Sequence, residues 1–495
     1  MGNQLHKNKK LNRPFILASV MLGMFLAAIE GTIVATAIPS IVADLGGFSL
    51  YSWVFSAYLL TNAATVLIFG KLSDTFGRKP VFVIGVSIFL VGSISCGLSN
   101  SMTMLIVSRF VQGLGAGAVM PIATTIVGDI YDKHERAKIQ GYLSSVWGIS
   151  AVTGPLLGGL FIDFLSWRYV FWMNLPLGIL AILGIVFFLH EDIEKKHQSI
   201  DYGGSIIIMV TVSSLLFILV EGGLKIPWTS PIMISLIILV ITGIIFFLVH
   251  EKRVKDPMMP MDIWRNKLIS VANVTTFITG MILIGVSSYL PAFVQGVMNQ
   301  SATIAGFTLT TMSIGWPISA IIAGKLLLVI GYRNTSLIGG ISLIIGGIFF
   351  YLLTPEMGPV WAGAGSFFIG VGMGFTSTSF IVSIQSTVNW ERRGIATATN
   401  MFMRSLGSAI GAALLGGLLN SKIESYLTNH SLGNKVSINA SNQILNLDSH
   451  GELSEKIKSV LQDGLTAGLH NVYSLLLIMA VVACILIAFL PKKES

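Results

Sequence analysis

Long apolar runs alternate with short polar segments along almost the whole chain of 495 residues. An α-helix needs about 20 mostly apolar residues to cross a bilayer. Fourteen runs qualify, near residues 15–38, 52–72, 81–98, 104–127, 138–161, 170–189, 204–220, 231–249, 270–294, 304–328, 335–353, 362–386, 395–418 and 467–490. The pattern therefore predicts an all-α integral membrane protein with 14 transmembrane helices.

The segment 420–466 is the one long stretch that breaks this pattern. Asn, Ser and Gly are frequent over 429–451, whereas residues 453–461 have the apolar spacing of an amphipathic helix. We expect this segment to form a small extracellular hairpin or cap.

Composition supports a membrane protein and excludes several other classes. Charged residues make up 11% of the chain and hydrophobic residues 53%, with a mean hydropathy of +0.79, whereas soluble domains carry roughly 25% charged residues. So few charges cannot cover a globular surface, which excludes a soluble enzyme and a nucleic-acid-binding domain. Cys96 and Cys484 fall in separate apolar runs, so we expect neither a disulfide framework nor a metal site.

Lys and Arg residues are divided unevenly between the two sets of loops. With a cytoplasmic N-terminus, 23 of the 31 fall in inside segments and 6 in outside segments. Cytoplasmic loops of membrane proteins carry the excess of positive charge. We therefore expect a protein of the cytoplasmic membrane with both termini inside, and we attribute the net charge of +8 to these loops.

Three sequence patterns in the first half of the chain recur in the second half at nearly one offset. The pairs are residues 70–79 with 324–333, 110–117 with 367–374, and Glu135-Arg136 with Glu391-Arg392. They predict two related six-helix bundles, in 1–200 and 263–495, with two inserted linker helices in 201–262. Secondary transporters have paired halves with the substrate site between them. The chain has no G-x-x-x-x-G-K-[ST] motif, so we expect no ATPase subunit and an ion or substrate gradient as the energy source.

Glu30 and Arg109 are charged residues inside apolar runs and are candidate functional residues. Glu30 lies in the first run and Arg109 in the fourth, and a charge at that depth is costly enough to mark a functional site by default. A carboxylate can take up and release a proton as its hydration changes, so Glu30 is a candidate proton carrier with Arg109 as its candidate partner. The alternative for Glu30 is a structural hydrogen bond to a neighbouring helix. The alternatives for Arg109 are a permanent salt bridge that ties helices together and a side chain that snorkels to the membrane interface.

The loop after the second run holds Gly70, Asp74, Gly77, Arg78 and Lys79. Its glycines allow two helix ends to approach closely, and its charges can latch one bundle to the other on the inner face. The alternative is a loop whose charges only set the topology.

A glycine-proline motif lies within the fifth run, at Gly154, Pro155, Gly158 and Gly159. Proline inside a helix bends it, and small residues four apart let another helix pack tightly. The alternative is tight packing with no role in the direction of transport.

These motifs together resemble those of the major facilitator superfamily. The resemblance rests on the loop 70–79, on Arg109-Phe110-Val111-Gln112-Gly113 and on Gly154-Pro155-x-x-Gly158-Gly159. Residues 28–39, parts of 167–176 and residues 201–204 are similar to the 14-span drug:proton antiporter branch of that family.

The resemblance implies alternating access by two bundles and proton-driven efflux of lipophilic or cationic drugs and antibiotics. It implies proton coupling by Glu30 and Arg109, a conformational latch at Asp74 and Arg78, and an exporter's glycine-proline helix. The expected partners are small lipophilic substrates, protons and the lipid bilayer, and no cofactor is expected beyond the proton gradient.

Two positions depart from that branch. The acid in the first helix is usually Asp, whereas this chain has Glu30, and the thirteenth span carries Arg404 and no acid. The absence of acids there argues against strongly dicationic substrates. The alternative function is a dedicated exporter of a single metabolite or lipid on the same scaffold.

Overall fold

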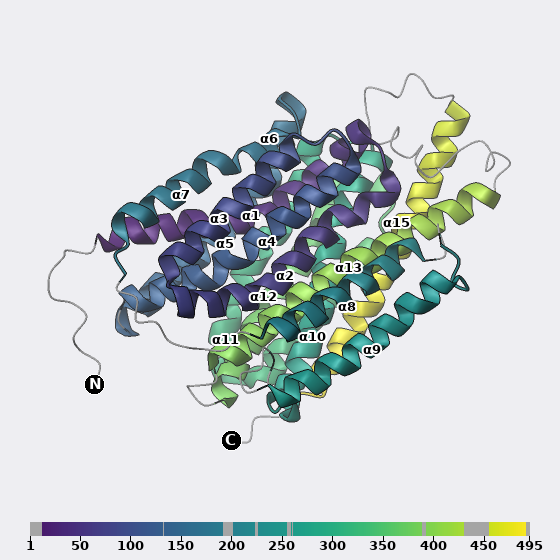
Figure 1. Cartoon of the computed structure of the whole chain (residues 1–495). Helices are drawn as coiled ribbons and strands as arrows, with labels where there is room; N and C mark the ends of the chain where they lie inside the picture. Colours follow the sequence, from purple (N-terminus) through teal and green to yellow (C-terminus); the bar gives the residue numbers. More distant parts are fainter. Residues whose placement is uncertain are drawn as a thin grey trace.

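The computed structural model describes residues 12–131, 133–191, 201–222, 226–254, 259, 261–388, 393–429 and 455–491, and this part of the chain is almost entirely helical (Figure 1). The helices of the first half are α1 (Arg13–Leu45), α2 (Tyr51–Phe76), α3 (Arg78–Gly97), α4 (Met102–Ile130), α5 (Lys133–Phe164), α6 (Tyr169–Trp172) and α7 (Asn174–Phe188). Then come α8 (Tyr202–Glu221) and α9 (Pro231–Arg253). The second half holds α10 (Lys267–Ala292), α11 (Ala302–Tyr351), α12 (Gly358–Thr387), α13 (Arg393–Asn429) and α15 (Glu455–Ala488).

Eleven helices in the described part are long and apolar enough to cross a membrane. Two shorter apolar helices, Gly148–Phe164 and Gly203–Leu219, belong to α5 and α8, and α2 covers the predicted span 52–72. The all-helical, multi-pass prediction is therefore confirmed, while the count of fourteen spans stays a prediction.

Two glycines mark the repeat that the sequence predicted. Gly77 separates α2 from α3 with φ +95°, and Gly331 interrupts α11 with φ +76°. These positive φ values exclude a Cβ without strain, so both helix pairs turn at a residue that must be glycine. The two positions are 254 residues apart, which is the offset of the repeated motif.

The helices pack as two groups with a third pair beside them (Figure 1). Helices α1 to α7 contact one another, as do α10 to α15, and α8 packs on α9. Helix α8 also contacts α2 of the first group and α13 of the second, so the inserted pair lies along the boundary between them. The limits 1–200, 201–262 and 263–495 stay predictions.

The two groups are joined at the helix ends that lie away from both chain termini (Figure 1). Tyr51 donates from its hydroxyl to the carbonyl of Ser288, and their backbones belong to α2 and α10. Asn420 donates to the carbonyl of Ser49 at 2.8 Å. The rings of Tyr51 and Tyr289 stack with centroids 5.6 Å apart. The boundary is therefore closed at this end by direct contacts.

The flanks of the segment 420–466 are helical. Helix α13 continues to Asn429, and α15 begins at Glu455. Both extensions carry buried apolar residues, namely Ile423, Leu427, Leu461 and Leu465. These parts are thus extensions of spanning helices, whereas residues 430–454 lie outside the described part.

Candidate functional site

Glu30 and Arg109 form an ion pair inside the first group of helices. Arg109 Nη1 donates to Glu30 Oε1, and the side chains of Arg109 and Glu30 are 2% and 0% exposed. Glu30 lies well inside α1, which has 33 residues, so it is far from both helix ends. The structure therefore brings together the two charges that the sequence placed within the first and fourth apolar runs.

Polar side chains of α3, α4 and α7 complete a network around this pair. Asn174 Nδ2 donates to Glu30 Oε2 at 2.9 Å and to Ser93 Oγ at 2.9 Å. Gln112 Oε1 accepts from Arg109 Nη1 at 2.7 Å, and its Nε2 donates to Ser93 Oγ at 2.8 Å. Both carboxylate oxygens of Glu30 thus accept hydrogen bonds from side chains that are themselves buried.

Helix α2 holds the guanidinium of Arg109 from the other side. Its Cζ atom lies 4.2 Å from the centroid of the Tyr58 ring, and its Nε donates to the carbonyl of Val54 at 3.2 Å. A cation over an aromatic face gains about 2 kcal/mol when both are desolvated. Arg109 therefore ties α1, α2 and α4 together through one planar group.

Close helix packing brings Arg109 within reach of α2. A Cβ on Gly113 of α4 would overlap the hydroxyl of Thr61, and Gly117 meets Thr65 in the same way one turn further along. The Thr61 hydroxyl donates to a main-chain carbonyl of α4 at 3.0 Å. Small residues and interhelical hydroxyls of this kind are how membrane helices approach closely.

The network can exist in two forms. While Glu30 is ionised, its charge and that of Arg109 cancel, and the surrounding hydrogen bonds offset part of the cost of removing both from water. If Glu30 takes up a proton, the guanidinium keeps its charge, since arginine does not lose its proton in proteins. Arg109 then loses its ionic partner, so the hydrogen bonding of α1, α4 and α7 must change.

The loop between α2 and α3 is fastened within the first group of helices. The main-chain N–H groups of Arg78 and Lys79 donate to the two carboxylate oxygens of Glu191 at 2.8 and 2.9 Å. Arg78 Nε lies 3.0 Å from Asp129 Oδ2, and Lys79 Nζ donates to two carbonyls at the end of α7 at 2.7 and 2.9 Å. A carboxylate at a helix N-terminus stabilises that helix end, so Glu191 holds the start of α3.

The predicted latch begins on α2, which contains Gly70 and Asp74. The surroundings of Gly70 and the side chain of Asp74 lie outside the described part of the chain. The contacts of Arg78 and Lys79 tie this loop to its own bundle, and a latch that reaches the other bundle stays a prediction.

Two glycines of α5 allow this helix to pack closely on α1 within the first group. A Cβ on Gly154 would overlap the hydroxyl of Thr32 on α1. A Cβ on Gly158 would lie 2.9 Å from the carbonyl oxygen of Ile33, which is closer than real Cβ contacts. Both glycines therefore let α5 lie against α1 just beyond Glu30.

The same helix also packs closely against the second group. A Cβ on Gly159 would lie 2.6 Å from Cα of Thr303 on α11, and a Cβ on Gly306 would overlap the carbonyl oxygen of Pro155. We call this contact the α5–α11 seam. Helix α5 runs through Pro155 as one element, from Lys133 to Phe164, and a role of this motif in the direction of transport stays a prediction.

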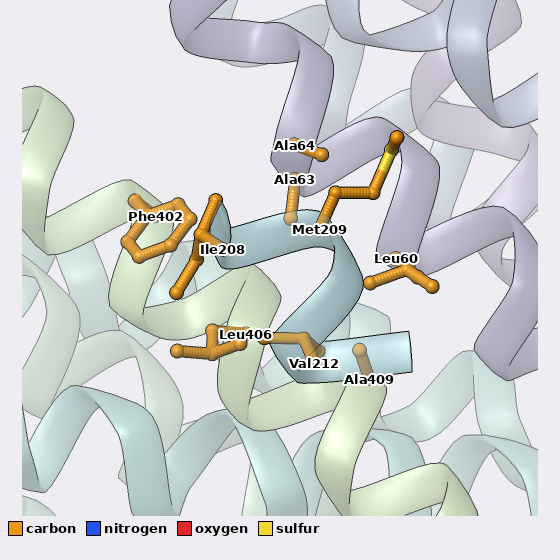
Figure 2. A pocket seen from close by; sticks show the side chains of 9 residues that line it. All are labelled: Leu60, Ala63, Ala64, Ile208, Met209, Val212, Phe402, Leu406 and Ala409. Atoms are coloured by element: carbon orange, nitrogen blue, oxygen red, sulfur yellow. The ribbon is translucent and has the colours of Figure 1, made fainter. Parts of the chain in front are cut away.

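A second seam, between α2 and α13, is covered by the inserted helix α8. Figure 2 shows apolar side chains of the three helices converging there. They leave a space of only about 10 Å³, and the lining residues are Leu60, Ala63, Ala64, Ile208, Met209, Val212, Phe402, Leu406 and Ala409. So small a space holds at most one water, so the three helices pack closely along the α2–α13 seam.

Sequence reasoning assigned no role to six residues of these contacts, namely Tyr58, Ser93, Gln112, Asn174, Asp129 and Glu191. Serine and tyrosine are ordinary members of an apolar run, and nothing in their spacing distinguishes them. The two acids lie close to helix ends, where a charge needs no special role. Both acids could have been found by asking which carboxylates pair with the positive residues of the loop 70–79.

Comparison with known proteins agrees on the family. A family model described as "Major Facilitator Superfamily" matches residues 20–412. "Multidrug resistance protein 3" of Bacillus subtilis (strain 168) is 34% identical over 98% of this chain and 96% of its own length. "Multidrug transporter protein MdtP" of the same organism is 36% identical over 85% of this chain and 78% of its own.

Among solved structures, a similar fold is found in a bacterial homologue of the human lysosomal transporter Spinster, described as inward-facing and unoccupied. The superposition covers 98% of this chain and 98% of that one, with a TM-score of 0.73 and 15% sequence identity. At that identity the likeness concerns the fold alone.

Proposed function

Because the chain belongs to the Major Facilitator Superfamily, we propose that it exports lipophilic or cationic drugs and antibiotics in exchange for protons. The family and the relatives identify it as a multi-pass membrane transporter and not an enzyme. The names of the two Bacillus relatives support drugs as the substrates. The distribution of Lys and Arg supports the cytoplasmic membrane, with both termini inside.

The buried pair of Glu30 and Arg109 is the observation that carries proton coupling. Proton uptake by Glu30 removes one charge from the pair and leaves the other, which changes how α1 is tied to α4 and α7. Gly31, the next residue, is exposed, and no atom lies within 4 Å of a Cβ placed on it. The network is thus one residue from open space, which supports access for protons.

Alternating access is supported by the way the two bundles meet. Hydrogen bonds between them gather at the end away from the termini, through Tyr51, Ser288 and Asn420. The α5–α11 seam is lined by glycines, and small residues leave smooth surfaces on which packed helices can shift relative to one another. We propose that a proton on Glu30 biases this closed end toward opening.

A transport assay with a matched control tests the coupling. Purified protein in liposomes with an imposed pH gradient is expected to accumulate the dye ethidium against its gradient. Glu30→Gln should abolish this uphill movement and keep exchange of dye at equal concentrations, because exchange needs no proton. Asp44→Asn is the control, since Asp44 is an acid on the same helix whose side chain is 49% exposed and paired with Arg168.

The outcome separates coupling from a structural role. Uphill transport by Glu30→Gln at the wild-type rate would refute the proton role of Glu30. Loss of both uphill transport and exchange would assign Glu30 to the structural hydrogen bond considered as its alternative.

A panel of substrates separates the multidrug function from a dedicated exporter. Movement of several unrelated lipophilic compounds supports multidrug export. Movement of only one compound would favour the single-metabolite alternative.

A further inference from the structure

Arg404 is a second cation inside the membrane-spanning part, and its surroundings differ from those of Arg109. It lies on α13, partly exposed, with its guanidinium Cζ 5.7 Å from the ring centroid of Trp316 on α11. Among the described residues, this guanidinium has the Trp316 ring as a partner and no hydrogen-bond or ion-pair partner, whereas Arg109 has a carboxylate, an amide oxygen and a carbonyl.

Arg404 forms no ion pair with an acid in the part of the chain that the structure describes. Helices α10, α11 and α12 contain no Asp or Glu. The acid of α13 is Glu424, which lies 20 residues further along the helix and hence about 30 Å away. Glu30, the acid inside the first bundle, is already paired with Arg109.

The contact between Arg404 and Trp316 lies between the two seams. Helix α13 packs on α2, and α11 packs on α5, so these helices form opposite sides of the boundary between the bundles. A side chain that reaches from α13 to α11 therefore crosses the middle of this boundary. Arg404 lies five residues inside the candidate span Thr399–Asn429, or about 8 Å from the start of that span along the helix axis.

We infer that Arg404 and Trp316 form an anchor for the carboxylate of a lipophilic substrate. This inference rests on the proposed function and narrows its substrate class. A guanidinium presents N–H groups in a planar fork that fits a carboxylate, while the neighbouring indole offers a flat surface for an apolar ring. The charges of Glu30 and Arg109 cancel, so Arg404 gives the boundary between the bundles a net positive charge. A substrate with an anionic head group is therefore favoured over one with a cationic head group.

Three probes that share one apolar group and differ in their head groups test this assignment. The probes are 1-pyrenebutyrate, 1-pyrenebutyramide and 4-(1-pyrenyl)butyltrimethylammonium, and their fluorescence reports equilibrium binding to the purified full-length protein. Wild-type protein should bind the carboxylate most tightly, the amide less tightly and the ammonium least tightly. Because this order is measured without any substitution, the test does not depend on a variant that folds.

Two variants and a control then locate the effect. Arg404→Gln should weaken binding of the carboxylate about tenfold or more, as expected for a lost charge-assisted hydrogen bond, and should leave the amide within about twofold. Arg404→Lys should lose less, because it keeps the charge without the planar fork. Arg265→Gln is the control, since Arg265 is an exposed arginine outside the membrane-spanning helices.

Each outcome decides either the anchor or the proposed function. Equal binding of carboxylate and ammonium by wild-type protein, or an unchanged ratio in Arg404→Gln, would overturn the anchor. Liposome transport of the same probes under a pH gradient reports separately on the proposed function. Uphill movement without preference for the carboxylate would overturn the anchor alone, and intact binding order without any uphill movement would overturn proton-driven export alone.

Discussion

Replacing Arg109 by glutamine would leave the carboxylate of Glu30 inside the bundle without its cation. Glu30 would keep the amide donor of Asn174 at 2.9 Å, but it would lose the guanidinium that contacts its other oxygen. Breaking a buried ion pair by removing one partner costs about 3–5 kcal/mol. Because Asn174 remains, we expect the lower end, about 3 kcal/mol.

The loss of stability should depend on pH in this variant and not in the reciprocal one. In Arg109→Gln the uncompensated group is a carboxyl, which a proton can neutralise, so the loss is complete at high pH and shrinks as the pH falls. In Glu30→Gln the uncompensated group is the guanidinium of Arg109, which stays charged at every working pH. The free energy of unfolding of that variant should therefore be lowered equally at pH 5 and pH 8.

Thermal unfolding of detergent-purified protein measures both effects. For a unit the size of the first bundle, 1 kcal/mol shifts the melting temperature by about 2–4 °C, so Arg109→Gln should melt roughly 6–12 °C below wild type at pH 8. The double variant should lose less than the sum of the single variants. Arg168→Gln is the control, because its pair with Asp44 is exposed on both sides and such pairs contribute about 0–1 kcal/mol.

Three results would refute this reasoning. Arg109→Gln melting at the wild-type temperature at pH 8 would show that the pair contributes nothing. A deficit of the same size at both pH values would show that Glu30 is not the uncompensated group. Strictly additive losses in the double variant would show that the two residues are not coupled.

Three further predictions concern the glycines and the start of α3. Gly306→Ala should impair transport without loss of expression, because its Cβ would overlap the carbonyl oxygen of Pro155. Gly324→Ala is the control and should leave transport unchanged, because its Cβ would meet no atom within 4 Å. Gly77→Ala should lower the free energy of unfolding by about 1–3 kcal/mol, as expected for a side chain at φ +95°, and an unchanged melting temperature would contradict this. Glu191→Gln should cost about 1 kcal/mol by weakening the cap on α3, measured in the same melts; a wild-type midpoint would exclude this role.

Hydropathy predicted most of the fold because the bilayer imposes a local rule on the chain. A spanning segment must be apolar and must satisfy its own main chain, so each helix can be recognised from its own residues. Gly77 and Gly331, which have positive φ values, occupy equivalent places in the repeated motif, while the two related halves stay a prediction. The flanks of 420–466 were the exception, since buried leucines such as Leu461 and Leu465 continue the helix beyond the apolar run.

The sequence by itself determined that Glu30 and Arg109 must have buried partners, because an isolated charge is too costly within lipid. Only the tertiary structure decided that they pair with each other, that Asn174 and Ser93 complete their hydrogen bonds, and that the guanidinium of Arg404 lies against the ring of Trp316. The reason is that the partner of a buried side chain depends on how each helix is rotated and how closely it approaches its neighbours. Rotation and approach follow from contacts between distant glycines and hydroxyls, which no single stretch of sequence contains.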